Sequence, residues 1–275
     1  MSDLYPLAWS TLGCPDWTLE QAAEHAAANG YRALEVRLLD REIIPADLSP
    51  DQRQRVKRVM KQHDIGIIAL GLSTRFSASD PAERQKNVRD LERYIELADD
   101  LGVPYVRTFG GNVMDGNTIN QTIDWVAAGI GAALPAAEQY GVTVLLETHV
   151  AFCRGQEVAA VLAQVPHDRL KAVWDVHHPF RMGESIKETW QWIGARTAHI
   201  HLKDARLRPD GSWQLVLLGQ GEVPCRQVVE LLHAKGYQGA ISAEWEKKWH
   251  PEIEPPEIAL PQHAETLRTW FRQLY

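Results

Sequence analysis

The segment KAVWDVHHPFRMGESIKETWQWIGARTAHIHLKD, residues 171–204, contains the pattern that decides the fold. It begins with a strand-like run at 171–178, continues through a stretch with helical spacing at 185–194, and ends in a second strand-like run at 197–204. Two strands joined by a helix are typical of a parallel pair, because parallel strands need a long crossover connection. The segment therefore predicts one β–α–β unit.

The same alternation extends along the chain in both directions. Further strand candidates, rich in Val, Ile, Leu and aromatic residues, occupy 5–13, 31–37, 65–72, 105–111, 142–150 and 239–246. Further segments with helical spacing occupy 18–30, 49–64, 81–102, 122–141, 155–165, 224–236 and 259–275. Eight such alternations predict a single α/β domain over 1–275, folded as a closed (β/α)8 barrel. An open doubly wound sheet is the alternative, but STLGCPDW, after the first strand, is not a glycine-rich nucleotide-binding turn.

Composition and charge limit the partners of the chain. The formal net charge of −7 argues against general binding to nucleic acid or acidic membranes. The three cysteines are odd in number and widely separated, which is typical of reduced thiols. No apolar run approaches the roughly 20 residues that span a bilayer, and MSDLYPLAWS does not resemble a secretory leader. We therefore expect a cytoplasmic protein with a small-molecule substrate and no nucleic-acid or membrane partner.

Polar side chains gather near the ends of the last four strand candidates. They are Glu147 and His149; Asp175, His177 and His178; His199, His201 and Lys203; and Glu244 and Glu246. In a (β/α)8 barrel, active-site groups project from the carboxyl ends of the strands. These polar residues are therefore the candidates for a functional site.

Strand alternation sharpens the prediction of a metal site. In TAHIHLKD, His199 and His201 share one strand face and Ile200 lies on the other, so the polar face is expected to point toward the barrel axis. Carboxylates that converge there would repel one another unless they bound a cation. We therefore predict one divalent ion, Mn²⁺, Mg²⁺ or Zn²⁺, with the ligands Glu147, Asp175, His201 and Glu244. His201 lies nearer the functional rim, and His199 is expected one layer deeper, as a packing or supporting group.

Four motifs, in this order, resemble a known superfamily. LLETH, DVHH, HIHLKD and ISAEWE are similar to the xylose isomerase-like sugar phosphate isomerases and epimerases, and the resemblance covers nearly the whole chain. That superfamily includes tagatose 3-epimerases, inosose dehydratase, hydroxypyruvate isomerase and the endonuclease IV type of repair enzyme. The resemblance implies a TIM barrel, one divalent ion held by a Glu, Asp, His and Glu set at the four positions above, and a homo-oligomer. It also implies that His178 contacts substrate, although strand alternation alone favours His177.

The sequence departs from the ketose 3-epimerase pattern at two positions. Cys153 stands where those enzymes have a second Glu, and Leu207 stands where they have a substrate-binding Arg, with Arg206 and Arg208 on either side. His149 and the segment HLKDAR are closer to the inosose dehydratase and general isomerase branches. These departures leave open a dehydratase on the same scaffold.

The motifs together predict a metal-dependent isomerase or epimerase of a sugar, sugar phosphate or keto-polyol. Such an enzyme abstracts a proton next to a carbonyl through a metal-stabilised enediolate. Glu147 and Glu244 are predicted to act as the acid/base pair as well as ligands. The candidates for substrate binding are His178, His149, Lys203 and Arg206. A dehydratase is the alternative, whereas a repair nuclease and a non-catalytic barrel are disfavoured by the acidic charge and by the intact ligand set, respectively.

Overall fold

Eight strands form a closed barrel, which confirms the predicted (β/α)8 fold. The computed structural model describes residues 4–274. Neighbouring strands follow one another in the order β1-β12-β9-β8-β7-β6-β5-β2. Their bounds are β1 Leu7–Ser10, β2 Ala33–Val36, β5 Gly66–Arg75, β6 Tyr105–Phe109, β7 Thr143–Glu147, β8 Leu170–Asp175, β9 Thr197–Leu202 and β12 Ala240–Ala243.

Helices alternate with these strands along the chain. Their bounds are α1 Leu19–Ala28, α2 Pro50–Gln62, α3 Pro81–Leu101, α4 Ile119–Gln139, α5 Gly155–Gln164, α6 His177–Arg181, α7 Ile186–Ile193, α8 Cys225–Ala234 and α9 Pro256–Arg272. Short 3-10 turns occupy Thr11–Gly13, Val150–Phe152 and Gly194–Arg196. Helices α1, α4 and α7 begin at capping boxes, in which the side chain of Thr18, Thr118 or Ser185 accepts a backbone N–H from the first turn.

The chain separates into two compact units. The first unit contains residues 1–43, 57–68 and 199–275, and the second contains 44–56 and 69–198. The expectation of a single domain over the whole chain stays a prediction.

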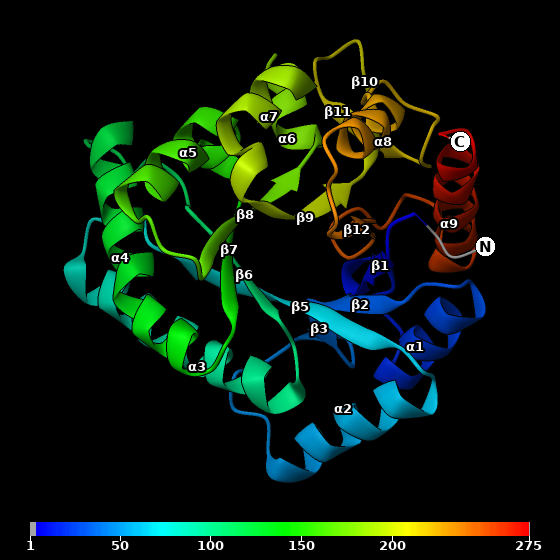
Figure 1. The fold of residues 1–275 in the computed structure, drawn as a ribbon, viewed down its shortest axis with the longest axis horizontal. Helices are drawn as coiled ribbons and strands as arrows, with labels where there is room; N and C mark the ends of the chain where they lie inside the picture. Colours follow the sequence, from blue (N-terminus) through cyan, green and yellow to red (C-terminus); the bar gives the residue numbers. More distant parts are fainter. Residues whose placement is uncertain (1–3, 275) are drawn as a thin grey trace. The chain divides into compact units, whose positions relative to one another are not determined.

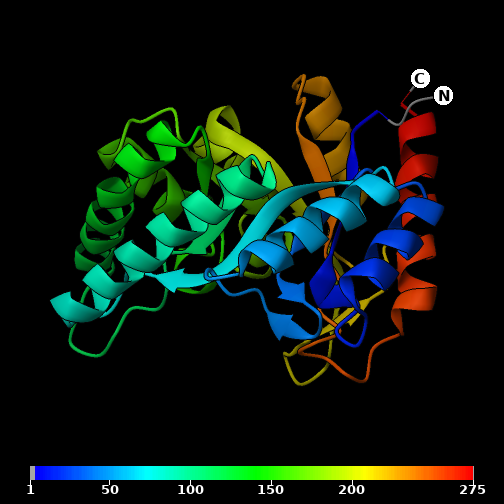
Figure 2. The same cartoon turned by 90° about the horizontal axis from the view of Figure 1, so that it is seen from below.

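In the first unit, parallel pairing joins β2 to β1, β1 to β12, and β12 to β9. Helices α1 and α9 lie beside each other in both views (Figures 1 and 2). The Tyr31 hydroxyl, next to the end of α1, donates to the Leu260 carbonyl of α9 over 2.9 Å. The side chains of Trp9 and Trp245 are fully buried in this unit. The pairing brings β9, which carries His201, beside β12, which Glu244 follows directly.

In the second unit, β6 pairs in parallel with β5 and β7, and β7 with β8. Helices α3 and α4 run beside each other on the outer side of these strands (Figure 1). Helix α3 ends at Gly102, whose φ of 70° is left-handed and therefore suits glycine. The Thr148 hydroxyl links the ends of β7 and β8, because it donates to the Asp175 carbonyl over 3.0 Å and accepts the Asp175 N–H over 2.9 Å.

Among the strand boundaries that differ from the sequence prediction, two lie beside predicted site residues. The predicted strand at 171–178 ends at Asp175, and His177 and His178 lie in the short helix α6. The Asp175 Oδ1 atom accepts the His177 N–H over 3.0 Å, so the chain turns at the end of the strand. The predicted strand at 197–204 ends at Leu202, and Asp204 begins another strand.

Two small antiparallel sheets were not predicted. One pairs β3, Leu38–Leu39, with β4, Glu42–Ile43, and the other pairs β10, Asp204–Leu207, with β11, Trp213–Val216. Their strands have two to four residues, which is too short for a reliable alternating pattern. The β10–β11 hairpin is an insertion between β9 and α8.

Candidate metal and substrate site

His201 and Glu244 lie at the carboxyl ends of the neighbouring strands β9 and β12. The register pairs His201 with Ser242, and the Glu244 N–H donates to the Leu202 carbonyl over 3.0 Å, so the backbones stay paired up to the site. The His201 Nδ1 atom lies 3.5 Å from the Glu244 Oε1 atom. His201 is fully buried and Glu244 is 4% exposed. The structure thus brings together two of the four predicted ligands in the first unit.

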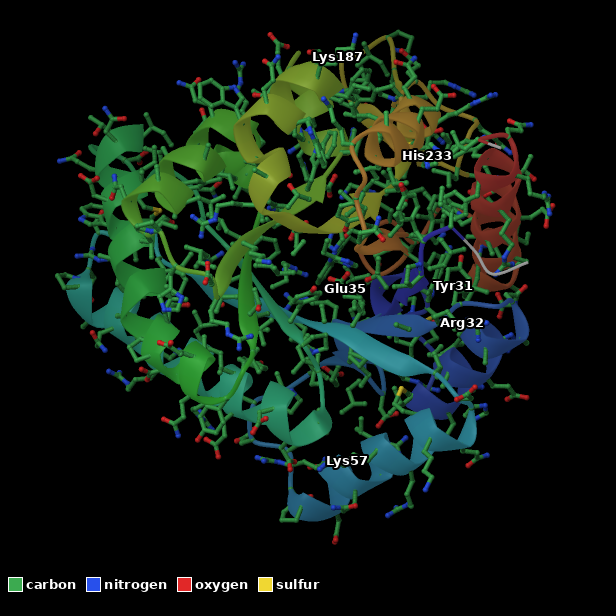
Figure 3. All side chains as sticks on the ribbon, viewed as in Figure 1. Tyr31, Arg32, Glu35, Lys57, Lys187 and His233 are labelled. Atoms are coloured by element: carbon green, nitrogen blue, oxygen red, sulfur yellow. The ribbon has the colours of Figure 1, made fainter. Side chains whose placement is uncertain are left out.

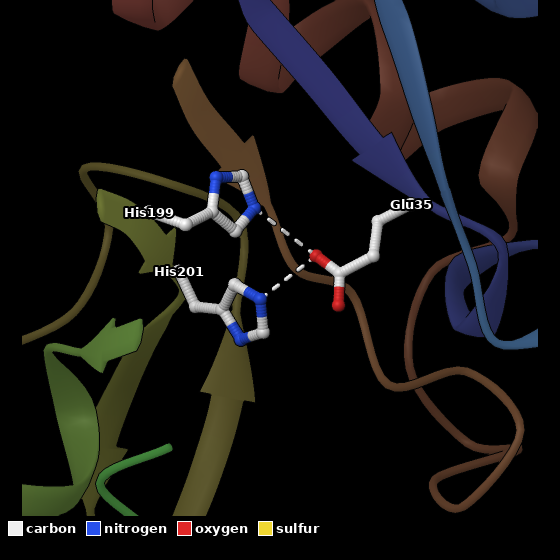
Figure 4. Close-up of side chains that lie close together, drawn as sticks. All are labelled: Glu35, His199 and His201. Carbon is white, nitrogen blue, oxygen red and sulfur yellow. Dashed lines mark hydrogen bonds and ion pairs between the residues drawn. The ribbon is translucent and has the colours of Figure 1, made fainter. Parts of the chain in front are cut away.

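Glu35, on β2, is a buried carboxylate that the sequence analysis did not identify. Its Oε2 atom lies 2.8 Å from His201 Nε2 and 3.2 Å from His199 Nε2 (Figure 4). Figure 3 shows Glu35 on the side of β2 opposite to Lys57 of α2. Burial alone would raise the pKa of Glu35, but the charge and hydrogen bonds of His201 and His199 outweigh it and hold that pKa well below its usual range. Glu35 is therefore an ionised carboxylate between two imidazoles.

Lys203 is almost completely enclosed by the protein. Its side chain is 2% exposed, and its Nζ atom lies 2.8 Å from Glu244 Oε2 and also pairs with Glu246 Oε1. A buried ammonium group requires such partners, because the free energy of removing it from water is unfavourable. Lys203 therefore contacts a predicted ligand, Glu244, and its role as a substrate-binding residue stays a prediction.

Asp204, the last residue of the HLKD motif, forms hydrogen bonds to a nearby loop. Its carboxylate accepts backbone N–H groups from Gly219 and Gly221, both over 2.9 Å, and from Val223 over 3.2 Å. A Cβ atom at Gly221 would lie 2.2 Å from Asp204 Oδ1, so the close approach requires glycine. Asp204 therefore anchors the glycine-rich loop that precedes α8.

Arg206, predicted to bind substrate, lies on the exposed part of the β10–β11 hairpin. Its Nη2 atom donates to the Gln220 carbonyl over 2.6 Å. The guanidinium group thus braces the same loop, and a contact of Arg206 with substrate stays a prediction.

In the second unit, Glu147 ends β7 and pairs with Arg107 of β6. Arg107 Nε lies 3.1 Å from Glu147 Oε2, and both side chains are at most 3% exposed. Arg107 also donates to the Leu72 carbonyl over 3.1 Å, and its guanidinium carbon lies 4.2 Å from the centre of the Phe109 ring. These contacts hold the Arg107 side chain in place beside the carboxylate of Glu147.

Asp175 and two histidines lie close together at the end of β8. His178 Nε2 lies 3.4 Å from Asp175 Oδ2. The ring of His149 lies 4.4 Å from that of His178 and 4.6 Å from that of Phe109, measured between ring centres. His178 is 5% exposed and His149 is half-buried. The second unit thus carries Glu147, Asp175 and both predicted substrate-binding histidines.

The chemistry of these donors fits a divalent metal ion. Buried carboxylates lie at strand ends in each unit taken by itself, and the first unit also carries the buried imidazole of His201. Oxygen donors with one imidazole suit Mn²⁺, Mg²⁺ and Zn²⁺. Glu35, His199 and His201 form another group whose ligand atoms lie within 4.8 Å of one another. Clusters of potential metal ligands are therefore present.

Glu35 and Arg107 are the residues that the sequence analysis missed. Each is the one charged residue of its strand, ALEV for Glu35 and YVRTF for Arg107. An isolated charge of this kind is a usable signal, because buried charges are rare without a partner. The isolated charge does not show which residue is its partner.

Comparison with known proteins now places the chain in a family. A model of the xylose isomerase-like TIM barrel family matches residues 23–273. The chain therefore belongs to the xylose isomerase-like TIM barrel family.

Two curated relatives have names that describe isomerisation or epimerisation. The inosose isomerase of Halalkalibacterium halodurans is 25% identical over 232 residues, which is 80% of this chain and 80% of the relative. The fructoselysine 3-epimerase of Shigella flexneri is 21% identical over 246 residues, covering 85% of this chain and 87% of the relative. The chain is thus similar to enzymes that act on small sugar or polyol substrates.

Solved structures share the fold. The IolI protein with a bound zinc atom superposes with a TM-score of 0.84 at 19% identity, covering 98% of this chain and 99% of that one. The probable 3-DHS dehydratase AsbF of Bacillus anthracis superposes with a TM-score of 0.74 at 18% identity, covering 95% and 98%. Within residues 4–274, none of the helices combines the length and the apolar character that crossing a membrane requires.

Proposed function

We propose that this protein is a divalent-metal-dependent isomerase or epimerase of a sugar, sugar phosphate or keto-polyol. The observation that carries the proposal is the buried pair formed by His201 Nδ1 and Glu244 Oε1, 3.5 Å apart at the ends of neighbouring strands. An imidazole nitrogen and a carboxylate oxygen at this separation suit one ion with bonds of about 2.0–2.2 Å. The names of the two curated relatives support the same reaction class.

We propose that Glu147 and Asp175 complete the ligand set with His201 and Glu244. Support comes from the strand order, in which β7, β8, β9 and β12 are successive neighbours, and from the burial of all four side chains. Zinc in the solved structure of IolI supports a divalent ion in this fold. When bound, the ion would withdraw electron density from the substrate carbonyl and offset the negative charge that develops as the adjacent carbon loses its proton.

The two glutamates are the proposed acid/base pair. Arg107 lies beside Glu147 and Lys203 lies beside Glu244, so each side chain has a cationic neighbour. One glutamate, as the ionised carboxylate, takes the proton from carbon, and the other, as the carboxylic acid, gives its proton to the enediolate. Return to the opposite face of the same carbon gives epimerisation, whereas return to the neighbouring carbon interconverts aldose and ketose. His178, His149, Arg206 and Lys203 are the proposed substrate-binding residues.

A dehydratase is the second candidate. The neighbouring rings of His149 and His178, 4.4 Å apart, are suited to protonate a departing hydroxyl group. The similarity in fold to the 3-DHS dehydratase supports this candidate. Both reactions begin with removal of a proton next to a carbonyl, and they differ in whether a β-hydroxyl then leaves.

The test incubates Mn²⁺-loaded protein with inosose and with D-fructose in D₂O. Deuterium at the carbon next to the carbonyl, detected by NMR, together with a new sugar or polyol isomer, is the expected result. We expect Glu147→Gln and Glu244→Gln to slow exchange by about 10²–10⁴-fold. Glu265→Gln, at a carboxylate that is 69% exposed, is the matched control and should exchange normally.

Other outcomes separate the candidates. A new enone absorbance would assign the dehydratase instead. Protein that takes up neither Mn²⁺ nor Zn²⁺ and exchanges no proton would refute both.

A further inference from the structure

One oxygen of Glu35 holds two imidazole rings. The Nε2 atoms of His199 and His201 both point to Glu35 Oε2 (Figure 4), over 3.2 and 2.8 Å. All three side chains are at most 1% exposed. An ionised carboxylate only accepts hydrogen bonds, so each ring donates from Nε2. The hydrogen bond to Glu35 therefore selects the Nε2–H form of His201.

This selection decides which atom of His201 is presented to an ion. A metal ion binds an imidazole nitrogen that carries no proton, and the hydrogen bond of the second nitrogen sets which one that is. Because the Nε2–H of His201 donates to Glu35, the ligand atom of His201 is Nδ1. The same Nδ1 atom lies 3.5 Å from Glu244 Oε1.

Lys203 acts on Glu244 in a parallel way. Its ammonium group lies 2.8 Å from Glu244 Oε2, on the opposite oxygen from the one near His201. Glu246 also pairs with Lys203 and so fixes the position of the ammonium group. Because Oε2 is held by Lys203, the ligand atom of Glu244 is Oε1.

We propose that Glu35 and Lys203 are positioning residues that select the metal-binding atoms, His201 Nδ1 and Glu244 Oε1. A continuous chain of contacts runs from Glu246 through Lys203 and Glu244 to His201 and Glu35. This arrangement orients both ligands before the ion arrives, which lowers the entropy lost on binding. The proposal rests on the metal site of the proposed function.

The first test measures zinc affinity by competition with a chelating dye, without any substrate. Removal of a carboxylate that orients a histidine ligand typically weakens metal binding about 10–100-fold, and we expect this loss for Glu35→Ala. Glu35→Gln keeps an oxygen acceptor and should recover part of the affinity. His199→Gln is the matched control, since it removes the other ring from the same oxygen and leaves the Glu35–His201 contact intact. It should bind zinc within about threefold of wild type, because only the contact to His201 orients a ligand.

The second test identifies directly which atoms of His201 and Glu244 bind the ion. Long-range ¹H–¹⁵N NMR of the zinc-loaded, ¹⁵N-histidine-labelled protein should show the His201 proton on Nε2 and zinc on Nδ1. A crystal structure of the same complex should show zinc on Glu244 Oε1, with Oε2 still bonded to Lys203. These measurements use the wild-type chain, so they remain decisive if Glu35→Ala fails to fold.

Several results would overturn the proposal. They are zinc on His201 Nε2 or Glu244 Oε2, an ion seated between Glu35, His199 and His201, or a folded Glu35→Ala protein with unchanged affinity. Failure to bind zinc at all would overturn both this proposal and the proposed metal site. Zinc on the predicted atoms without deuterium exchange in any substrate would refute the proposed reaction alone.

Discussion

Acidification should destabilise this protein through His263, a buried histidine on α9. The ring is fully buried, with its centre 5.9 Å from that of the Trp9 ring and 5.3 Å from that of the Trp245 ring. Its Nδ1–H donates to the Ala259 carbonyl over 2.7 Å, and Nε2 has no hydrogen-bond partner among the described residues. A proton on Nε2 would therefore place an unpaired charge between two aromatic rings.

The magnitude follows from the pKa shift. Burial lowers the pKa of His263 from 6.5 to about 4, while the bond to Ala259 opposes the shift. The unfolded chain then binds the proton more tightly, so the stabilisation is present above pH 6.5 and is lost as the pH falls toward 4. Linkage between these two pKa values lowers the free energy of unfolding by about 2 kcal/mol from pH 7 to pH 5, and by about 3 kcal/mol below pH 4.

The assay compares wild type with His263→Gln by urea unfolding at pH 7, 6 and 5. Glutamine can still donate to the Ala259 carbonyl but does not titrate in this range. The other ionisable groups are common to both proteins, so the difference between the two free energies of unfolding isolates His263. From pH 7 to pH 5, the variant should lose about 2 kcal/mol less free energy of unfolding than wild type does. A difference that stays constant from pH 7 to pH 5 would show that the burial argument is wrong.

Three further predictions concern the candidate site and its support. Arg107→Met removes the cation beside the buried carboxylate of Glu147 and should cost about 3–5 kcal/mol of stability in metal-free protein, measured by chemical denaturation; an unchanged unfolding midpoint would contradict the buried ion pair. Asp204→Ala removes the acceptor for three loop N–H groups and should speed hydrogen exchange across residues 217–223, whereas unchanged exchange would show that the loop is held by other contacts. Chelation followed by Mn²⁺ at 100 times its Kd should raise the free energy of unfolding by about 3 kcal/mol, and a Tm insensitive to Mn²⁺ would count against the metal site.

Much of the fold could be predicted because its signal is local. The alternation of strand and helix candidates follows from periodicities of about 2 and 3.6 residues, and the closed barrel confirms that reading. The errors lie where side chains cap or turn the backbone. Asp175 accepts the His177 N–H and ends β8 three residues before the predicted boundary, and periodicity carries no information about such a bond.

The sequence predicts candidate site residues by their type and position, but it does not give the partners of their side chains. Lys203 illustrates the difference, because the sequence indicates an inward-facing cation and the structure gives it two carboxylate partners in the segment just after β12. Trp245 and Trp249 both lie in the segment that follows β12, yet the side chain of Trp245 is fully buried and that of Trp249 is 51% exposed. Their environments depend on the course of the loop after β12.

By itself, the sequence determined the order of the eight barrel strands and the polar character of the last four strand ends, because both follow from short-range spacing. Only the tertiary structure decided which charges meet. Glu35 and His201 are separated by 166 positions, and the pairing of β2 with β1, β1 with β12 and β12 with β9 brings their strands into one sheet. Hydrophobic periodicity records which face of a strand is buried, whereas the partner of a buried charge depends on the pairing of distant strands.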